Sequence, residues 1–140
     1  MQKLPSLTIN DIPQHIEKVN FTKEAILDDM NVFYFPQPTN GITYVRFRAD
    51  VNKIPEQLWP FLPFFTQVAS RVGSAKYKHN ELNERIMMCS SGLEIELDSY
   101  ADEEGDEQHA LLFEFSFLDE NIEEAFINIT ELLARPNFKD

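Results

Sequence analysis

Residues 110–118 constrain the fold more than any other stretch of this chain. Their sequence, Ala-Leu-Leu-Phe-Glu-Phe-Ser-Phe-Leu, is apolar at every position except Glu114 and Ser116. A short run that is apolar on both of its faces is typical of a central strand. We therefore expect a sheet with this strand in its interior.

Two further stretches alternate between apolar and polar residues, as half-buried strands do. In residues 93–98 the polar positions are all acidic, namely Glu94, Glu96 and Asp98. In residues 42–49 one face carries Tyr44, Arg46 and Arg48. A β-branched and aromatic run at 32–35 precedes this stretch, and Pro-Gln-Pro-Thr-Asn-Gly at 36–41 separates the two. The pattern predicts a strand, a turn and a second strand.

Three helices are expected between and after these strands. The first begins between Pro60 and Pro63 and stops at Gly73, the second runs from about residue 79 to Gly92, and the third starts at the N-cap Asn121. The resulting order, β-β-α-α-β-β-α, indicates an antiparallel α+β fold with helices packed on one face of the sheet. Residues 1–31 show no clear period and are predicted to be an extended lead-in to a domain at 32–140.

Charge restricts the class of partner. The 140 residues carry a formal net charge of −12, and residues 71–140, with six basic and seventeen acidic side chains, account for −11 of it. Nucleic acid and anionic membranes both select basic surfaces, so neither is an expected partner. A basic partner would complement the negative charge of residues 71–140. The single cysteine excludes an internal disulfide.

The residues show no catalytic apparatus of their own. His15, His79 and His109 lie too far apart in sequence for a helical zinc motif. A metal site built from His109 with Asp106 or Glu107 is conceivable, but a solvated acidic loop is the stronger interpretation. Cys89 falls on the apolar stripe of the second helix and is interpreted as a core residue.

Several short motifs resemble, in order, the start of the C-terminal half of pitrilysin/insulinase-type zinc metallopeptidases. Together they cover essentially the whole chain. They are Leu4-Pro5-Ser6-Leu7, Asp11-Ile12-Pro13, Thr39-Asn40-Gly41, residues 54–63, Ser91-Gly92-Leu93, residues 117–121 and Pro136-Asn137-Phe138.

This resemblance implies a repeat without a zinc site. The family is built from four related α+β repeats around a closed peptide chamber, and the first repeat holds zinc through His-x-x-Glu-His. When residues 73–77 are matched to the stretch after that motif, the motif positions fall on residues 64–68. There Phe64 and Val68 stand in place of the two histidine ligands and Gln67 in place of the glutamate base. Neither zinc nor any other cofactor is therefore expected in this chain.

The function expected from the resemblance is that of a non-catalytic, chamber-forming repeat in a zinc metalloendopeptidase that degrades targeting presequences and other short unfolded peptides. Its partners would be the remaining repeats, peptide substrates and, for the isolated chain, a second copy. The acidic face formed by Glu94, Glu96 and Asp98 would contact basic peptides, unless it is an outward solvated face. The expected location is the mitochondrial matrix for a eukaryotic protein, or the cytoplasm for a bacterial one. A structural core-subunit-like member of the same fold and a free-standing acidic interaction module remain alternative functions.

Overall fold

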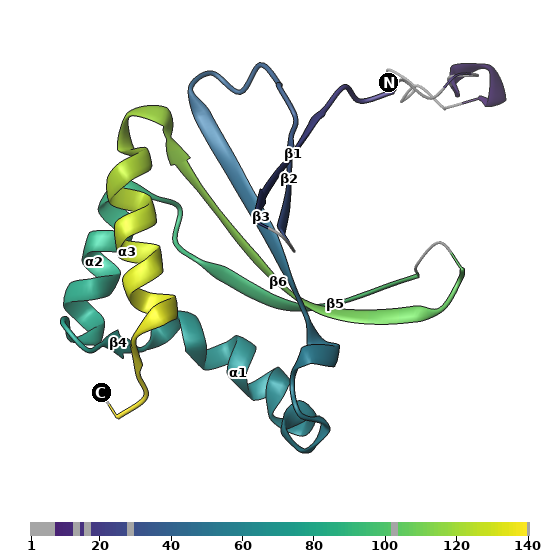
Figure 1. The fold of residues 1–140 in the computed structure, drawn as a ribbon. Helices are drawn as coiled ribbons and strands as arrows, with labels where there is room; N and C mark the ends of the chain where they lie inside the picture. Colours follow the sequence, from purple (N-terminus) through teal and green to yellow (C-terminus); the bar gives the residue numbers. More distant parts are fainter. Residues whose placement is uncertain (1–7, 13–14, 16–17, 28–29, 102–103, 140) are drawn as a thin grey trace, which may run out of the picture. The chain divides into compact units, whose positions relative to one another are not determined.

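The computed structural model describes residues 8–12, 15, 18–27, 30–101 and 104–139 (Figure 1). The chain divides into two compact units, residues 1–38 and 39–140. The Leu4–Leu7 motif, Pro13 of the following motif, and Asp102 and Glu103 of the predicted acidic loop lie outside the described residues. No helix in the described part of the chain is long and apolar enough to cross a membrane.

The first unit contains a hairpin that the sequence did not indicate. Strand β1 (Thr22–Leu27) pairs antiparallel with β2 (Met30–Tyr34), after a short 3-10 turn, η1 (Ile9–Asp11). The predicted lead-in therefore contains a strand, and β2 pairs with β1 rather than with residues 42–49. Strand β1 lacks the alternation of apolar and polar residues that would predict it, because a lysine, Lys23, packs on an aromatic ring. Its ammonium lies 5.5 Å from the centroid of Phe33.

A tight turn precedes the first strand of the second unit. Asn40 and Gly41 both have positive φ, 55° and 81°, and the N–H of Ile42 donates to the carbonyl of Thr39 at 3.3 Å. Such a pair of left-handed residues is characteristic of a type I′ turn, which favours Asn-Gly. Here the turn leads into β3 (Ile42–Asp50), which belongs to a different sheet from β2.

A three-stranded antiparallel sheet forms the centre of the second unit. Its strand order is β3-β6-β5, where β6 is Glu107–Leu118 and β5 is Glu94–Ala101. The apolar run is therefore the central strand, as predicted. The register places Phe47 and Ile95 on either side of Phe113, so all three lie on one face.

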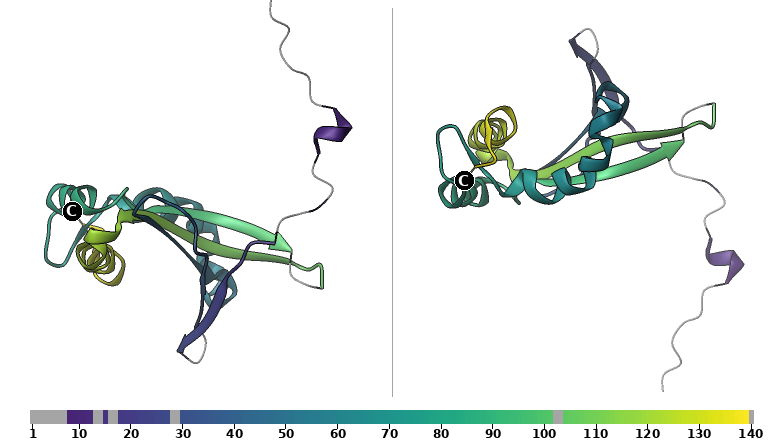
Figure 2. Two further views of the ribbon diagram at one scale, coloured as in Figure 1. Left: turned by 90° about the horizontal axis from the view of Figure 1, so that it is seen from above. Right: turned by 90° about the horizontal axis from the view of Figure 1, so that it is seen from below.

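Three α-helices in the described residues pack on this apolar face: α1 (Leu62–Val68), α2 (His79–Cys89) and α3 (Ile122–Ala134). Helices α2 and α3 lie side by side at the end of the sheet away from the β5–β6 hairpin (Figures 1 and 2). The buried core joins alternate residues of the sheet to one side of each helix. It includes Leu62, Leu82, Ile86, Cys89, Ile95, Leu111, Phe113, Phe115, Phe117, Ala125, Ile129 and Leu132. This arrangement confirms the antiparallel α+β class.

Some details differ from the sequence prediction. The full order is β1-β2-β3-α1-β4-α2-β5-β6-α3-β7, in which the two-residue strands β4 (Gly73–Ser74) and β7 (Pro136–Asn137) pair with each other. Helix α1 is short because Pro60 lies in a preceding 3-10 segment, η3 (Glu56–Phe61), and another 3-10 turn, η4 (Ala69–Arg71), follows it. The α-helix therefore begins only after Pro60, within the range that the sequence predicted.

Candidate functional site: the polar sheet face and the adjoining hollow

The second face of the sheet is polar. Cross-strand pairing places alternate residues of β3, β6 and β5 on this side of the sheet. Its members are Tyr44, Arg46, Arg48, Asp50, Ala110, Leu112, Glu114, Ser116, Glu94, Glu96 and Asp98. We call this set the polar face. The three acids predicted to share a face therefore do so, but two arginines share it with them.

Two ion pairs neutralise part of the polar face. Arg46 Nε contacts Glu114 Oε1 on the neighbouring strand. Arg48 reaches over the central strand to Asp98, with its Nη2 2.9 Å from Asp98 Oδ2. Its guanidinium carbon also lies 4.4 Å from the ring centroid of Tyr100. The two contacts of Arg48 link the outer strands β3 and β5 across β6, whereas Arg46 links β3 to β6.

Glu94 and Glu96 are the two carboxylates of β5 that these ion pairs do not neutralise. Both are exposed, and neither has an ion pair in the described part of the chain. With Asp98 and Glu114 engaged, these two glutamates carry the unbalanced charge of β5, and Asp50 at the end of β3, whose side chain accepts from the N–H of Asn52, is a further carboxylate of this face. The broad acidic face expected from the sequence is thus reduced to two adjacent glutamates on β5.

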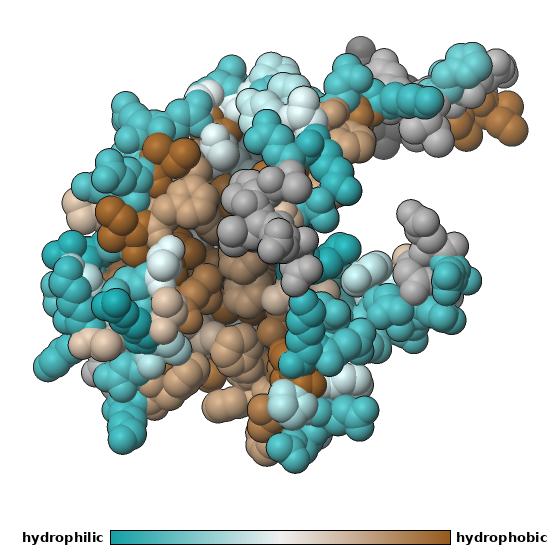
Figure 3. Space-filling view, in the orientation of Figure 1, coloured by the Kyte–Doolittle hydropathy of each residue, from teal (hydrophilic) through white to brown (hydrophobic). Residues whose placement is uncertain are grey.

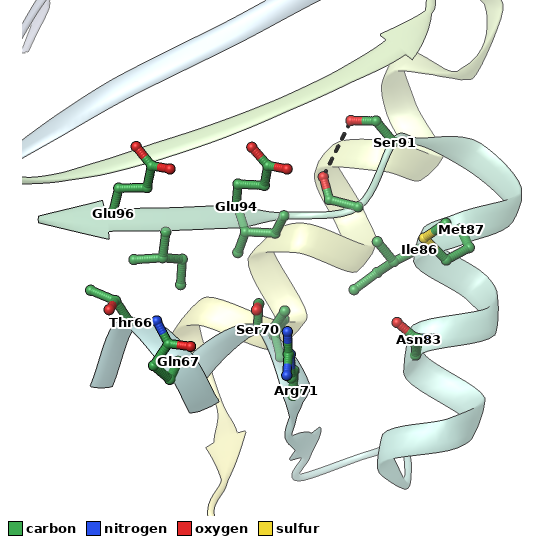
Figure 4. Close-up of a pocket in the computed structure, with 14 residues that line it drawn as sticks. Thr66, Gln67, Ser70, Arg71, Asn83, Ile86, Met87, Ser91, Glu94 and Glu96 are labelled. Carbon is green, nitrogen blue, oxygen red and sulfur yellow. Dashed lines mark hydrogen bonds between the residues drawn. The ribbon is translucent and has the colours of Figure 1, made fainter. Parts of the chain in front are cut away.

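A hollow of about 390 Å³ lies beside the start of β5. Helix α1 contributes Thr66 and Gln67, the segment after it contributes Ser70 and Arg71, and α2 contributes Asn83, Ile86 and Met87. Figure 4 shows Glu94 and Glu96 on the side of β5 opposite to Thr66 and Gln67. The walls therefore offer amide and hydroxyl groups, one cation and an apolar patch, and Glu94 and Glu96 of β5 also border the hollow.

The residues matched to the zinc motif lie on α1. Gln67 is exposed and borders the hollow, Phe64 is 68% exposed, and Val68 is half-buried. Phenylalanine and valine have no atom that can bind a metal ion, and glutamine has no carboxylate to act as a base. Among the residues that the structure describes, no group of three or more His, Cys, Asp or Glu side chains is placed to hold a metal ion.

The cysteine belongs to the core. Cys89 is buried on α2, where its Sγ lies 3.2 Å from the carbonyl of Arg85 and 3.6 Å from the side-chain nitrogen of Asn128. No imidazole contacts its sulfur among these partners. His79 begins α2 and His109 lies on β6, so the described histidines are also spread over separate elements.

Several residues of this region were not singled out from the sequence. Ser70, Arg71 and Asn83 line the hollow although they are separated along the chain and share no motif. The pairing of Arg48 with Asp98 was also missed. Alternation placed each residue on a polar face, but no local signal shows that their strands flank the same central strand.

Comparison with known proteins gives a consistent result. The family model described as peptidase M-16C associated matches residues 1–140. "Presequence protease, mitochondrial" of Xenopus laevis is 28% identical over 98% of this chain, and the protein of that name from Saccharomyces cerevisiae is 32% identical over 71%. "Protein HypA" of Clostridium perfringens is 25% identical over 72%. The chain spans 13%, 10% and 10% of the lengths of these relatives, respectively.

Proposed function

This chain belongs to the peptidase M-16C associated family, and we propose that it forms a non-catalytic wall of the peptide chamber in a larger zinc metalloendopeptidase. The substrates would be targeting presequences and other short unfolded peptides, because the vertebrate and fungal relatives carry the name presequence protease. The mitochondrial designation of those relatives supports a mitochondrial matrix location for this chain.

One observation carries the chamber role. Glu94 and Glu96 are exposed side by side on a sheet face where Asp98 and Glu114 are already paired with arginine. Unpaired carboxylates attract cationic ligands over several ångströms without requiring one fixed geometry. Diffuse attraction of this kind suits basic peptides that differ in sequence.

Exposed apolar side chains on α3 support the assembly with further repeats. Ile122 is 51% exposed, Phe126 43% and Ile127 59%, and apolar surface extends over α3 in Figure 3. A helix with apolar residues on its outer side as well as its inner side is typical of one that is covered on both sides. The proposed cover is the remainder of the peptidase.

The charge role is tested in the full-length protein with Glu94→Gln and Glu96→Gln combined. We expect KM for an arginine-rich peptide to rise about fivefold at low salt, since each exposed carboxylate contributes about 0.5 kcal/mol at this range. The kcat should stay unchanged, and a neutral peptide should be unaffected. The control combines Glu84→Gln with Glu123→Gln, which removes the same charge from exposed helix positions. Equal losses for basic and neutral peptides would refute the role.

The non-catalytic assignment has its own test. The 140-residue chain, incubated with excess zinc and then desalted, is expected to retain no stoichiometric metal by mass spectrometry, because Phe64 and Val68 cannot act as ligands. One bound zinc per chain would contradict the assignment.

A further inference from the structure

One arginine has no carboxylate partner in the part of the chain that the structure describes. The other four arginines each form an ion pair with an acidic side chain, namely Arg46, Arg48, Arg85 and Arg135. Arg71 forms none within the described residues, although residues 71–140 carry seventeen acidic side chains. Its exposed guanidinium is therefore available to an anion that is not part of these residues.

Arg71 lines the hollow of about 390 Å³ together with three neutral polar side chains, Gln67, Ser70 and Asn83. In the view of Figure 4, Ser70 and Arg71 lie between Gln67 and Asn83. None of these four side chains makes a hydrogen bond to another described residue. A guanidinium presents a planar fork of N–H donors that matches the two oxygens of a carboxylate, and hydroxyl and amide groups can add neutral hydrogen bonds. This wall of the hollow can therefore bind a carboxylate.

Another part of the wall is apolar. Ile86 of α2 and Leu93 and Ile95 at the start of β5 line the hollow, and these side chains are almost fully buried. A concave site that combines an apolar wall with a few polar groups and one charged residue is typical of small-ligand pockets. The combination favours a ligand in which a carboxylate is attached to an apolar group.

The acids that border the hollow restrict the ligand further. Glu94 and Glu96 repel anions, but their side chains lie on the side of β5 opposite to Thr66 and Gln67 (Figure 4). A carboxylate is therefore favoured next to Arg71, on the helix side of the hollow, with its apolar group toward β5. Repulsion from the two glutamates grows with the charge of the ligand, so one negative charge is favoured over the two of a phosphate group.

We propose that the hollow binds the α-carboxylate of a peptide fragment that ends in an apolar residue, with the carboxylate at Arg71 and the last side chain against Ile86 and Ile95. Hydrolysis of a peptide bond consumes one water and leaves an α-carboxylate on one fragment and an amine on the other. Such fragments are therefore products of a peptidase. The carboxylate site stands on Arg71 and the walls of the hollow, whereas its occupation by cleavage products rests on the proposed function.

The test removes the cation from the hollow in the full-length protein. Arg71→Gln is compared with Arg135→Gln, which removes the same charge from an arginine that is 67% exposed and does not line the hollow. The probes are N-acetyl-leucine and its amide, which lacks the carboxylate, and their Kd values are measured by ligand-observed saturation-transfer NMR. A third probe, the α-amide of N-acetyl-aspartic acid, carries only a side-chain carboxylate. Since a carboxylate can also bind elsewhere in the full-length protein, only binding that changes with position 71 is assigned to the hollow.

We expect Arg71→Gln to raise the Kd of N-acetyl-leucine about tenfold through the loss of charge-assisted hydrogen bonds, and to leave the Kd of the amide unchanged. Arg135→Gln should change neither. An unchanged Kd for N-acetyl-leucine in Arg71→Gln would overturn the proposal, and so would an equal increase in Arg135→Gln. If the aspartate probe depends on Arg71 as strongly, the carboxylate site stands and its assignment to cleavage products fails. If binding depends on Arg71 but the full-length protein cleaves no peptide, the site stands and the proposed function fails.

A second variant keeps Arg71 and applies even if Arg71→Gln does not fold by circular dichroism. Asn83→Asp places a negative charge at the hollow, and Asn80→Asp adds the same charge to an exposed position of α2 that does not line it. We expect Asn83→Asp to raise the Kd of N-acetyl-leucine about threefold, the effect of one unit charge at about 6 Å in water, and to spare the amide. Equal effects of the two substitutions, or equal effects on the acid and the amide, would refute a carboxylate site in the hollow.

Discussion

Replacing Arg48 with methionine should strengthen the binding of basic peptides while it weakens the fold. Arg48 makes an ion pair with Asp98 at 2.9 Å and lies 4.4 Å from the Tyr100 ring, but its side chain is 45% exposed. An exposed ion pair contributes about 0.2–1 kcal/mol and an exposed cation–π contact about 0.5–1 kcal/mol. We expect Arg48→Met to lower the free energy of unfolding by about 0.7–2 kcal/mol.

The effect on binding has the opposite sign. Removal of the guanidinium leaves Asp98 without its cation, so the polar face becomes more negative by one unit beside Glu94 and Glu96. At a separation of about 8 Å in water, one unit of charge is worth about 0.5 kcal/mol. We expect KM for an arginine-rich peptide to fall about twofold at low salt and to change little at about 1 M salt, where the Debye length is only about 3 Å.

Arg85→Met is a closely matched control. Arg85 lies on α2, where it forms an ion pair with Glu81 at 3.6 Å and contacts the Tyr77 ring at 4.3 Å, and its side chain is 46% exposed. The same substitution there removes the same charge and the same two kinds of contact, away from the polar face. KM is measured for both variants in the full-length protein, with unfolding followed by urea titration. An increase in KM for Arg48→Met, or an equal decrease for Arg85→Met, would refute the local charge argument.

Two further predictions concern stability and pH. Leu82 is fully buried on α2, so Leu82→Ala should cost about 2–5 kcal/mol in urea unfolding, whereas Met88→Ala, at a site 79% exposed, should stay within about 0.5 kcal/mol; equal costs would contradict the assigned core. Hydrogen bonds from the backbone N–H and the hydroxyl of Thr8, at 2.7 and 2.9 Å, lower the pKa of Asp11 below its usual 3.8. This contact is therefore present at neutral pH and is lost as pH falls through the lowered pKa, and an NMR titration should show that Thr8→Ala raises the pKa.

Most strands and helices of the second unit could be predicted from the sequence, because the residue patterns that indicate them are local. The apolar run at 110–118 identified the central strand, and the alternation at 42–49 and 93–98 identified its two neighbours. Side-chain alternation is a property of the extended backbone itself, so it can be read without knowing the partner strand. The hairpin of the first unit could not be read in this way, because β1 begins Thr-Lys-Glu and its lysine contacts an aromatic ring.

The candidate site could be predicted from the sequence only in part. The sequence alone specified that Glu94, Glu96 and Asp98 share a face, and the resemblance excluded zinc ligands at Phe64 and Val68. Tertiary structure decided that Arg48 neutralises Asp98, so that Glu94 and Glu96 are the acids of the β5 pattern without an ion pair in the described residues, and that β5 is an edge strand beside a hollow. Arg48 and Asp98 are 50 residues apart and meet only because both of their strands pair with β6. Periodicity assigns a residue to a face, whereas strand order and register determine which charges on that face meet.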